Sequence, residues 1–242
     1  VKANLFYRDL AFRRFPAIGD TLSTVTTVVG LRENRRQEGR RPTGLAALHM
    51  RTVDQEGRGV LDFYRCAMLP LRGEQPTGHA TDLATLGVGG VDLDAGVVAG
   101  WERAAWGRSA DLPPAGTVIE VGGGDVVTSA PELARLSLNI ASVHHDARAA
   151  GGGRLVYGGH TIGIALAQAA RALPDLAGVL AWEGCDHLGP VHEGDTLRSL
   201  VTVRGIGVLG DWATLELEVA VHADDASDGS RPVLSWRFVA FA

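Results

Sequence analysis

The segment from Leu138 to His160 concentrates the side chains that could do chemistry. It reads LNIASVHHDARAAGGGRLVYGGH, with two adjacent histidines, one aspartate, a triple glycine and a Gly-Gly-His. An imidazole with an ordinary pKa near 6.5 exchanges protons at neutral pH, so His144 is the best candidate for a general base. Asp146 could fix the tautomer of this imidazole or cap the next turn. His145 is a weaker candidate, because neighbours on one strand point to opposite faces; the alternative for the whole segment is a solvent-facing polar turn.

The glycines that close this segment precede the one long apolar helix that the sequence predicts, from Thr161 to Leu173. The N–H groups at a helix start lack partners and carry the positive end of the dipole, so the Gly159 N–H could stabilise an enolate oxygen. Glycine there lets a ligand come close, although Gly158 and Gly159 could equally be the breakers that begin the helix. Tyr157 and His160 are expected to line the pocket, and the helix is expected to be buried nearly all round.

These elements need a scaffold, and a repeat in the chain predicts one. GDTLSTVTTVVGL (19–31) aligns without gaps on GDTLRSLVTVRGI (194–206), an offset of 175 residues. Each copy ends in an aromatic and β-branched run, GVLDFYRCAML or PVLSWRFVAFA, which is typical of strands with one buried face. Each copy is therefore expected to form a strand, a Gly-Asp turn, a long strand, a loop, a strand, a turn and a strand.

The repeat divides the chain into a first half at residues 1–72, a linker at 73–115 and a second half at 116–242. The long helix has no counterpart in the first copy and the chain starts with Val1, so we expect the first half to be incomplete at its N-terminus. Another element would then have to cover the inner face of the first sheet. The linker is expected to hold some local helix, and a shorter helix is expected to start near Ser129, with Glu132 in its first turn.

Composition limits the classes of protein and partner. The net charge of -5 leaves no basic surface, which argues against a nucleic-acid partner. No apolar run reaches the roughly 18 residues that a membrane span needs, so no membrane partner is predicted. Cys66 and Cys185 lack disulfide or zinc spacing, so both thiols are expected to be free in a reducing cytoplasm. No third ligand joins His144 and Asp146, so no metal site is predicted.

Residues Ser137 to Asp146, SLNIASVHHD, resemble the hydratase signature of the MaoC-like (R)-specific enoyl-CoA hydratases. Ser137 matches the serine of that signature, His144 the catalytic histidine and Asp146 the trailing aspartate. Asn139 replaces the catalytic aspartate. Together with RLVYGGHTIGIA and GDTLSTVTTVVGLREN, this segment is similar to the mesaconyl-CoA (2-methylfumaryl-CoA) hydratase, or β-methylmalyl-CoA dehydratase, branch. The resemblance covers residues 1–72 and about 116 to the end.

The resemblance implies an α+β double hotdog fold, in which each half is an antiparallel sheet wrapped round a long helix and catalysis occurs in one half only. The implied reaction is reversible hydration of an enoyl-CoA, mesaconyl-CoA to β-methylmalyl-CoA, with His144 in acid–base work and Asn139 orienting water or thioester. No cofactor is implied beyond the coenzyme A thioester that is the substrate, whose phosphates Arg154 could meet. Glu183 or Asp186 could supply the missing carboxylate, although a salt bridge at the rim is the favoured role.

Two other functions fit the same residues. Hotdog folds also host thioesterases, and the fold alone does not choose between the chemistries. A non-catalytic acyl-CoA-binding protein is the third hypothesis, favoured by Asn139 at the aspartate position and by the incomplete first half. In each case we expect an acyl-CoA as the small-molecule partner and a homo-oligomer, typically a dimer, in the cytoplasm.

Overall fold

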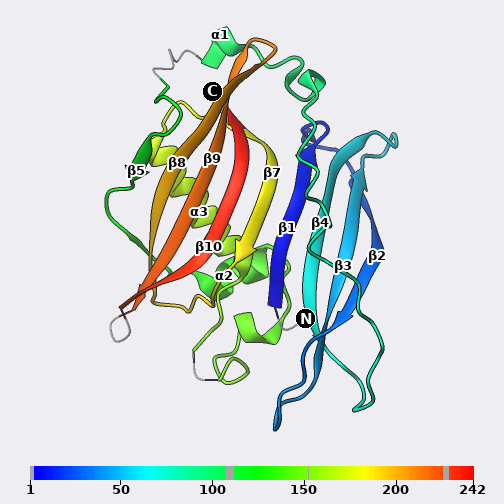
Figure 1. Ribbon diagram of the computed structural model, residues 1–242. Helices are drawn as coiled ribbons and strands as arrows, with labels where there is room; N and C mark the ends of the chain where they lie inside the picture. The colour runs from blue at the N-terminus through cyan, green and yellow to red at the C-terminus, as the bar shows by residue number, and fades with distance from the viewer. Residues whose placement is uncertain (1–2, 107–111, 152, 226–228) are drawn as a thin grey trace.

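The computed structural model describes residues 3–106, 112–151, 153–225 and 229–242. The described strands form one antiparallel sheet in the order β2-β3-β4-β1-β7-β10-β9-β8-β5, with β6 paired to β8 (Figure 1). The strands are β1 (Ala3–Phe12), β2 (Ser23–Glu33), β3 (Thr43–Val53), β4 (Gly59–Pro70), β5 (Val118–Glu120), β6 (Asp125–Val126), β7 (Gly178–His187), β8 (Thr196–Leu209), β9 (Trp212–Asp225) and β10 (Gly229–Phe241). The helices are η1 (Ala95–Val98), α1 (Arg103–Trp106), α2 (Ala130–Leu136), η2 (Ser142–His144) and α3 (Gly158–Ala172).

The repeat predicted from the sequence is a structural repeat. The order β2-β3-β4-β1 in the first half matches β8-β9-β10-β7 in the second, and the two halves meet where β1 pairs with β7. Both long strands carry a bulge at equivalent places, between Val28 and Gly30 in β2 and between Val203 and Gly205 in β8. The strand order expected for each copy is therefore confirmed.

The Gly-Asp turn has the same local structure in both halves. Gly19 and Gly194 have φ angles of 101° and 97°. Residues that carry a Cβ rarely adopt this backbone conformation, and glycine adopts it at no steric cost. In the second turn the buried Asp195 accepts hydrogen bonds from the His192 N–H at 2.8 Å and from Arg231 at 2.7 Å. This aspartate therefore closes the turn and joins it to β10.

Replacing Asp195 by alanine is expected to lower the free energy of unfolding by about 2 kcal/mol. The change removes a charged acceptor from two donors and leaves the Arg231 guanidinium without its partner. Urea unfolding measures the loss. Asp224→Ala is the control, because Asp224 pairs with Arg198 on an exposed part of the surface. An equal loss in the two variants would contradict the role given to Asp195.

Helix α3 packs against the second half of the sheet. Its Ile162, Ala165 and Ala169 belong to the same buried cluster as the residues that β7–β10 turn toward it. We call the side of the sheet that faces α3 the inner face. One row of paired residues runs across the sheet on this face: Val28, Leu48, Arg65, Tyr7, Cys185, Trp236, Val219, Val201 and Ile119. Strand pairing therefore places Arg65 and Tyr7 of the first half on the same face as the core of the second.

The expectation that the long helix is buried nearly all round is wrong. The helix starts at Gly158 and exposes Gly163, Ala167 and Ala170, whereas the polar Thr161 and Gln168 are buried. Gln168 Nε2 donates to the Leu197 carbonyl at 2.9 Å, which satisfies one end of its amide inside the core. The sheet covers one side of the helix, and its other side exposes these small residues and Arg171.

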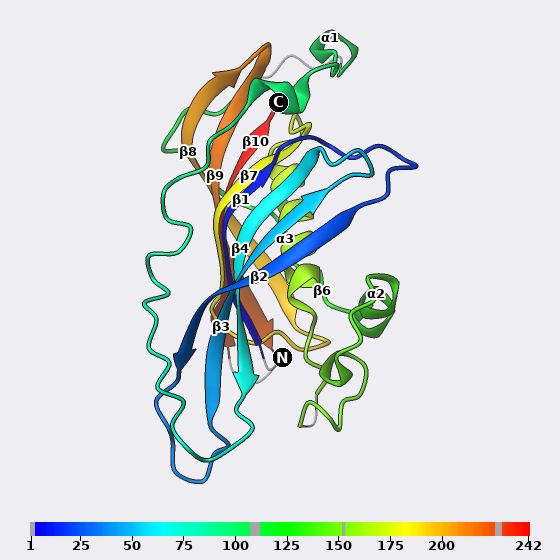
Figure 2. The same ribbon diagram turned by 90° about the vertical axis from the view of Figure 1, so that its right-hand side faces the viewer.

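The linker covers the outer face of the sheet, not the inner one. Figure 2 shows its described part running along the side of the sheet opposite α3. Leu83 and Leu86 pack there on Leu45, Ala47 and Cys66, and the expected local helix appears as η1 and α1. On the inner face of the first half, Val28 keeps 57% of its surface exposed, and no described helix packs on β2–β4 as α3 packs on β8. The expected covering element is therefore absent from the described residues.

The short helix α2 and the two cysteines agree with the sequence-based expectations. The short helix α2 follows Ser129 and carries Glu132 in its first turn, as predicted. Both cysteines, Cys66 and Cys185, are free and buried. Among the described residues, no helix has the length and apolar character required to cross a membrane.

Candidate active site

A cavity of about 850 Å³ lies where α3 begins. Three parts of the chain enclose it: the segment 137–144, the residues 155–161 at the start of α3, and the strands β1, β4 and β7 with the loop after β7. The first part includes Leu138 and Ile140, which are 82% and 88% exposed and therefore lie at the mouth. The cavity thus joins the chemically rich segment to the inner face of the sheet, and it receives residues from both halves.

His144 lines this cavity at the end of η2. Its Nδ1–H donates to the Leu155 carbonyl oxygen at 2.7 Å, a geometry that leaves Nε2 as the basic nitrogen of the neutral ring. The ring centroid is 6.1 Å from that of Tyr157, which lines the same cavity. A half-buried imidazole held in one tautomer by a backbone carbonyl is arranged for proton transfer at Nε2.

Of the two roles expected for Asp146, fixing the tautomer of this imidazole is not the one observed. Its Oδ1 accepts from the Arg148 N–H at 2.8 Å, so the exposed carboxylate caps the next turn, and Leu155 takes the orienting role. Asp146 is also not among the residues that line the cavity. The chain turns after His144, and this directs Asp146 away from the imidazole.

Asn139 and His145 form the turn that presents His144. The Nε2–H of His145 donates to the Asn139 carbonyl oxygen at 2.7 Å, and Asn139 Oδ1 accepts from the Ala141 N–H at 3.3 Å. The amide nitrogen of Asn139 remains as a donor on a residue that lines the cavity. His145 is not part of the cavity lining, in line with its weaker candidacy. The reason expected from the sequence does not apply, because His144 ends a 3₁₀ helix that His145 caps and the two residues are not on a strand.

The start of α3 brings Tyr157, Gly158 and Gly159 to the cavity. Tyr157 is the residue before the helix, and the N–H groups of both glycines belong to the first turn, whose amides have no partner within the helix. Neither glycine has room for a side chain: a Cβ at 159 would lie 2.5 Å from Tyr157 Oη, and one at 158 would lie 2.7 Å from Cε1 of the His187 ring. The two glycines therefore let the rings of Tyr157 and His187 lie against the helix start.

Besides Asp146, two more of the predicted site residues lie outside the cavity lining. His160 is not part of the cavity lining, and its Nδ1 is buried with no hydrogen-bond partner among the described residues. Arg154 forms an ion pair with Glu193 and donates to the His145 carbonyl oxygen at 3.1 Å. It therefore supports the turn after His144 instead of lining the cavity.

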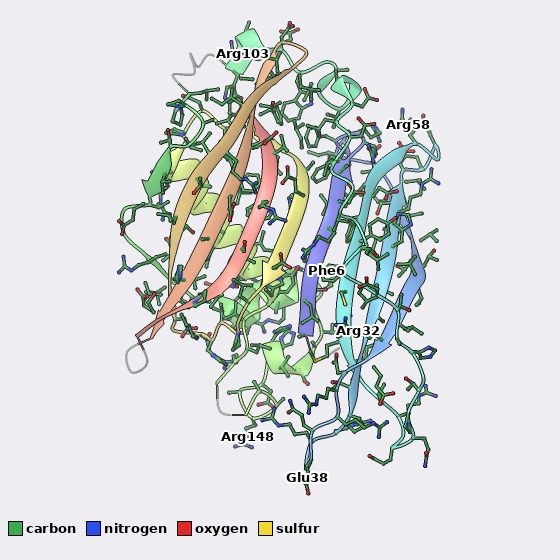
Figure 3. All side chains as sticks on the ribbon, in the orientation of Figure 1. Phe6, Arg32, Glu38, Arg58, Arg103 and Arg148 are labelled. Carbon is green, nitrogen blue, oxygen red and sulfur yellow. The ribbon has the colours of Figure 1, made fainter. Side chains whose placement is uncertain are left out.

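The acidic candidates near the second Gly-Asp turn are occupied in ion pairs. Asp186 pairs with Arg8, and Glu183 lies 3.8 Å from Arg237. Neither carboxylate lines the cavity, so the salt-bridge alternative is the one observed. Figure 3 shows Phe6 on β1, and the Arg8 guanidinium lies over its ring. The same figure shows the exposed Arg148 on the loop between η2 and α3.

Four residues that the sequence analysis missed complete the cavity: Asn4 and Tyr7 of β1, Arg65 of β4 and His187 of β7. Arg65 Nε and His187 Nε2 are buried and have no hydrogen-bond partner among the described residues, and the buried Asn4 amide lies beside the Tyr7 hydroxyl. Such groups are costly to bury unless a ligand or water satisfies them. One signal was available for Arg65: it stands between Phe63 and Ala67, two apolar residues that share its face of the strand.

The protonation states of two of these groups follow from burial. Burial raises the pKa of Tyr7 to about 12, so its hydroxyl keeps its proton at neutral pH. Burial lowers the pKa of His187, and the neighbouring Asp186 carboxylate opposes part of this effect. The His187 imidazole is therefore neutral at neutral pH, and its ring lies against the start of α3.

The lowered pKa of His187 predicts a pH-dependent stability. The folded state binds a proton here less readily than the unfolded chain, so stability is complete above the unfolded pKa near 6.5 and is lost as the pH falls through the folded pKa. His187→Leu is expected to reduce the loss of unfolding free energy between about pH 7.5 and about pH 5.5. Urea unfolding at several pH values measures this, with the exposed His222→Gln as control. A loss in His187→Leu equal to that in the parent would rule out the assignment.

Comparison with known proteins gives relatives of defined activity. No family model matches the sequence. The chain is 30% identical over 210 residues to the mesaconyl-CoA hydratase of Cereibacter sphaeroides and 29% identical over 213 residues to the β-methylmalyl-CoA dehydratase of Chloroflexus aurantiacus. Each alignment covers 81% of this chain, but 59% and 58% of the two relatives. The chain therefore spans less than two thirds of the length of these curated relatives.

Solved structures show the same fold. Rv0216, a conserved hypothetical protein from Mycobacterium tuberculosis with a double hotdog fold, is 50% identical with a TM-score of 0.87; the match covers 100% of this chain and 75% of that one. A structure from Chloroflexus aurantiacus described as a MaoC domain protein is 24% identical with a TM-score of 0.78, over 99% of this chain and 75% of that one. The chain is thus a double hotdog protein, which confirms the expected fold. Its sequence is similar to a mesaconyl-CoA hydratase and a β-methylmalyl-CoA dehydratase, in line with the resemblance to the MaoC-like hydratases.

Proposed function

We propose that this protein catalyses the reversible hydration of an enoyl-CoA, with mesaconyl-CoA and β-methylmalyl-CoA as the substrate pair. The observation that carries the proposal is the meeting of His144 and the start of α3 in one cavity. The two named relatives, at 30% and 29% identity, supply the particular substrate pair. The cavity volume of about 850 Å³ lies in the range typical of small-molecule sites.

Hydration of an enoyl thioester needs a base for water and donors for the charge that develops on the thioester oxygen. In the proposed mechanism, Nε2 of His144 takes a proton from water as the water oxygen adds to the β-carbon. The electron pair of the double bond moves toward the thioester oxygen, where the Gly159 N–H and the positive end of the α3 dipole stabilise the enolate. The imidazolium then returns the proton to the α-carbon, so the net change is the addition of one water.

Asn139 and Tyr157 orient the reactants in this mechanism. The free amide nitrogen of Asn139 is a donor for the attacking water or the thioester, and its position is set by the bond from Ala141. Tyr157 Oη lies beside the Cα of Gly159 and so next to the proposed oxygen site. No aspartate or glutamate is found among the described residues that line the cavity, so the base role falls to the imidazole.

The activity is tested with the full natural protein and mesaconyl-CoA. Loss of the enoyl-thioester absorbance without release of free thiol is the expected result. Release of coenzyme A would indicate the thioesterase alternative, and tight binding without turnover would indicate a binding protein. Either of these outcomes would overturn the hydratase proposal.

A further inference from the structure

We propose that Arg65 is the specificity-determining residue of this cavity and binds a free carboxylate at the end of the acyl group away from the thioester. The inference deepens the proposed function, because it rests on acyl-CoA binding in the cavity beside His144. It assigns a role to a residue of the first half, which carries no part of the hydratase-like signature. The substrate class is therefore a dicarboxylic monothioester.

Strand pairing fixes the position of Arg65 on the inner face. Arg65 of β4 pairs with Tyr7 of β1, which in turn pairs with Cys185 of β7, and Cys185 lies in the core beneath α3. Arg65 and Tyr7 both line the cavity. Since Leu138 and Ile140 lie at the exposed mouth, the strand residues form its floor. An acyl group that enters past His144 with its thioester at Gly159 extends toward this floor.

The charges around Arg65 favour an anionic ligand. No ion pair of Arg65 is found within the described part of the chain, and the described lining of the cavity contains no acidic side chain. Its Nε is buried and lacks a hydrogen-bond partner among the described residues. A buried donor without a partner is costly, and a carboxylate matches the planar donor arrangement of a guanidinium.

Neighbouring groups supply further donors for the same carboxylate. The Asn4 amide is buried on the cavity lining beside the Tyr7 hydroxyl. Tyr7 keeps its hydroxyl proton because burial raises its pKa to about 12. A phosphate of coenzyme A is the other anion of the substrate, but Arg65 comes from strand β4 on the floor of the cavity and not from the exposed mouth at Leu138 and Ile140. The acyl carboxylate is the anion that fits.

The test compares ligands that differ only in this carboxylate. Mesaconyl-CoA and (E)-2-methyl-2-butenoyl-CoA share the double bond and branch, but the second has a methyl group in place of the carboxylate. In Arg65→Met, kcat/KM for mesaconyl-CoA is expected to fall about 100-fold, while that for the methyl analogue stays within about threefold. Arg65→Lys, which keeps the charge, is expected to retain a clear preference for the carboxylate. Arg51→Met is the matched control, because Arg51 is exposed on the opposite face of the same half-sheet.

A binding measurement separates this inference from the proposed function. Methylsuccinyl-CoA and 2-methylbutanoyl-CoA lack the double bond and cannot react, so calorimetry reports carboxylate recognition without turnover. Tighter binding of methylsuccinyl-CoA that disappears in Arg65→Met supports the inference even where no hydration is observed. Equal weakening of both ligands in Arg65→Met, as a phosphate contact or a structural role would produce, overturns it. So does the absence of any preference in the parent protein, even with normal hydration.

Discussion

Replacing His144 by alanine is expected to lower kcat for hydration of mesaconyl-CoA by about 10³-fold. The substitution removes the basic nitrogen that the Leu155 carbonyl orients, and a positioned acid–base group contributes roughly 10²–10⁴-fold. KM is expected to change little, because the imidazole acts on water and on the reacting carbons and not on the coenzyme. Steady-state kinetics from the enoyl-thioester absorbance measures both parameters.

His145→Ala is the matched control for this prediction. The two histidines are adjacent, but His145 is not part of the cavity lining and its ring binds the Asn139 carbonyl oxygen. The control is expected to lose much less activity than His144→Ala, with a loss that reflects the looser Asn139 turn. Unchanged turnover in His144→Ala would remove the proposed base.

The Gly159→Ala variant is expected to lose about 10²-fold in kcat. A Cβ at this position would lie 2.4 Å from Cζ of Tyr157, so the ring must move into the space where the thioester oxygen is proposed to bind. Alanine keeps the backbone N–H, but a displaced Tyr157 ring would keep the thioester oxygen away from it, and loss of contact with one preorganised donor costs roughly 10²–10³-fold. The same steady-state kinetic measurement checks the result.

Gly163→Ala is the control for the helix substitution. Gly163 is exposed on α3, and a Cβ there meets no atom within 4 Å, so alanine is expected to leave kcat unchanged. Wild-type kcat in Gly159→Ala would show that the helix start is not the oxygen site.

The sequence predicts the scaffold well because the fold repeats. The offset of 175 residues between the Gly-Asp turns also separates β1 (Ala3–Phe12) from β7 (Gly178–His187), so the repeat extends to strands whose sequences do not visibly match. The sequence predicts a start for the long helix at Thr161, three residues later than the observed start at Gly158. Glycines often lie just outside a helix, but here Gly158 and Gly159 lie in its first turn, where they leave room for the rings of Tyr157 and His187.

The candidate site is predictable where it is contiguous in the chain. His144, Asn139, Tyr157, Gly158 and Gly159 all line one cavity, as the density of polar residues between 138 and 160 indicated. The first-half residues, including Arg65, reach the same cavity only through the pairing of β1 with β7. That pairing joins strands far apart in sequence, and no local pattern encodes it.

In the proposed mechanism, His144 Nε2 and the start of α3 lie on opposite sides of one bound thioester. A crystal structure of the full natural protein with methylsuccinyl-CoA tests this arrangement, because this ligand cannot react. We expect the thioester oxygen within about 3 Å of the Gly159 nitrogen, with the acyl β-carbon facing Nε2 of His144. An acyl group bound outside this cavity, or inside it with its β-carbon turned away from the imidazole, would rule the mechanism out.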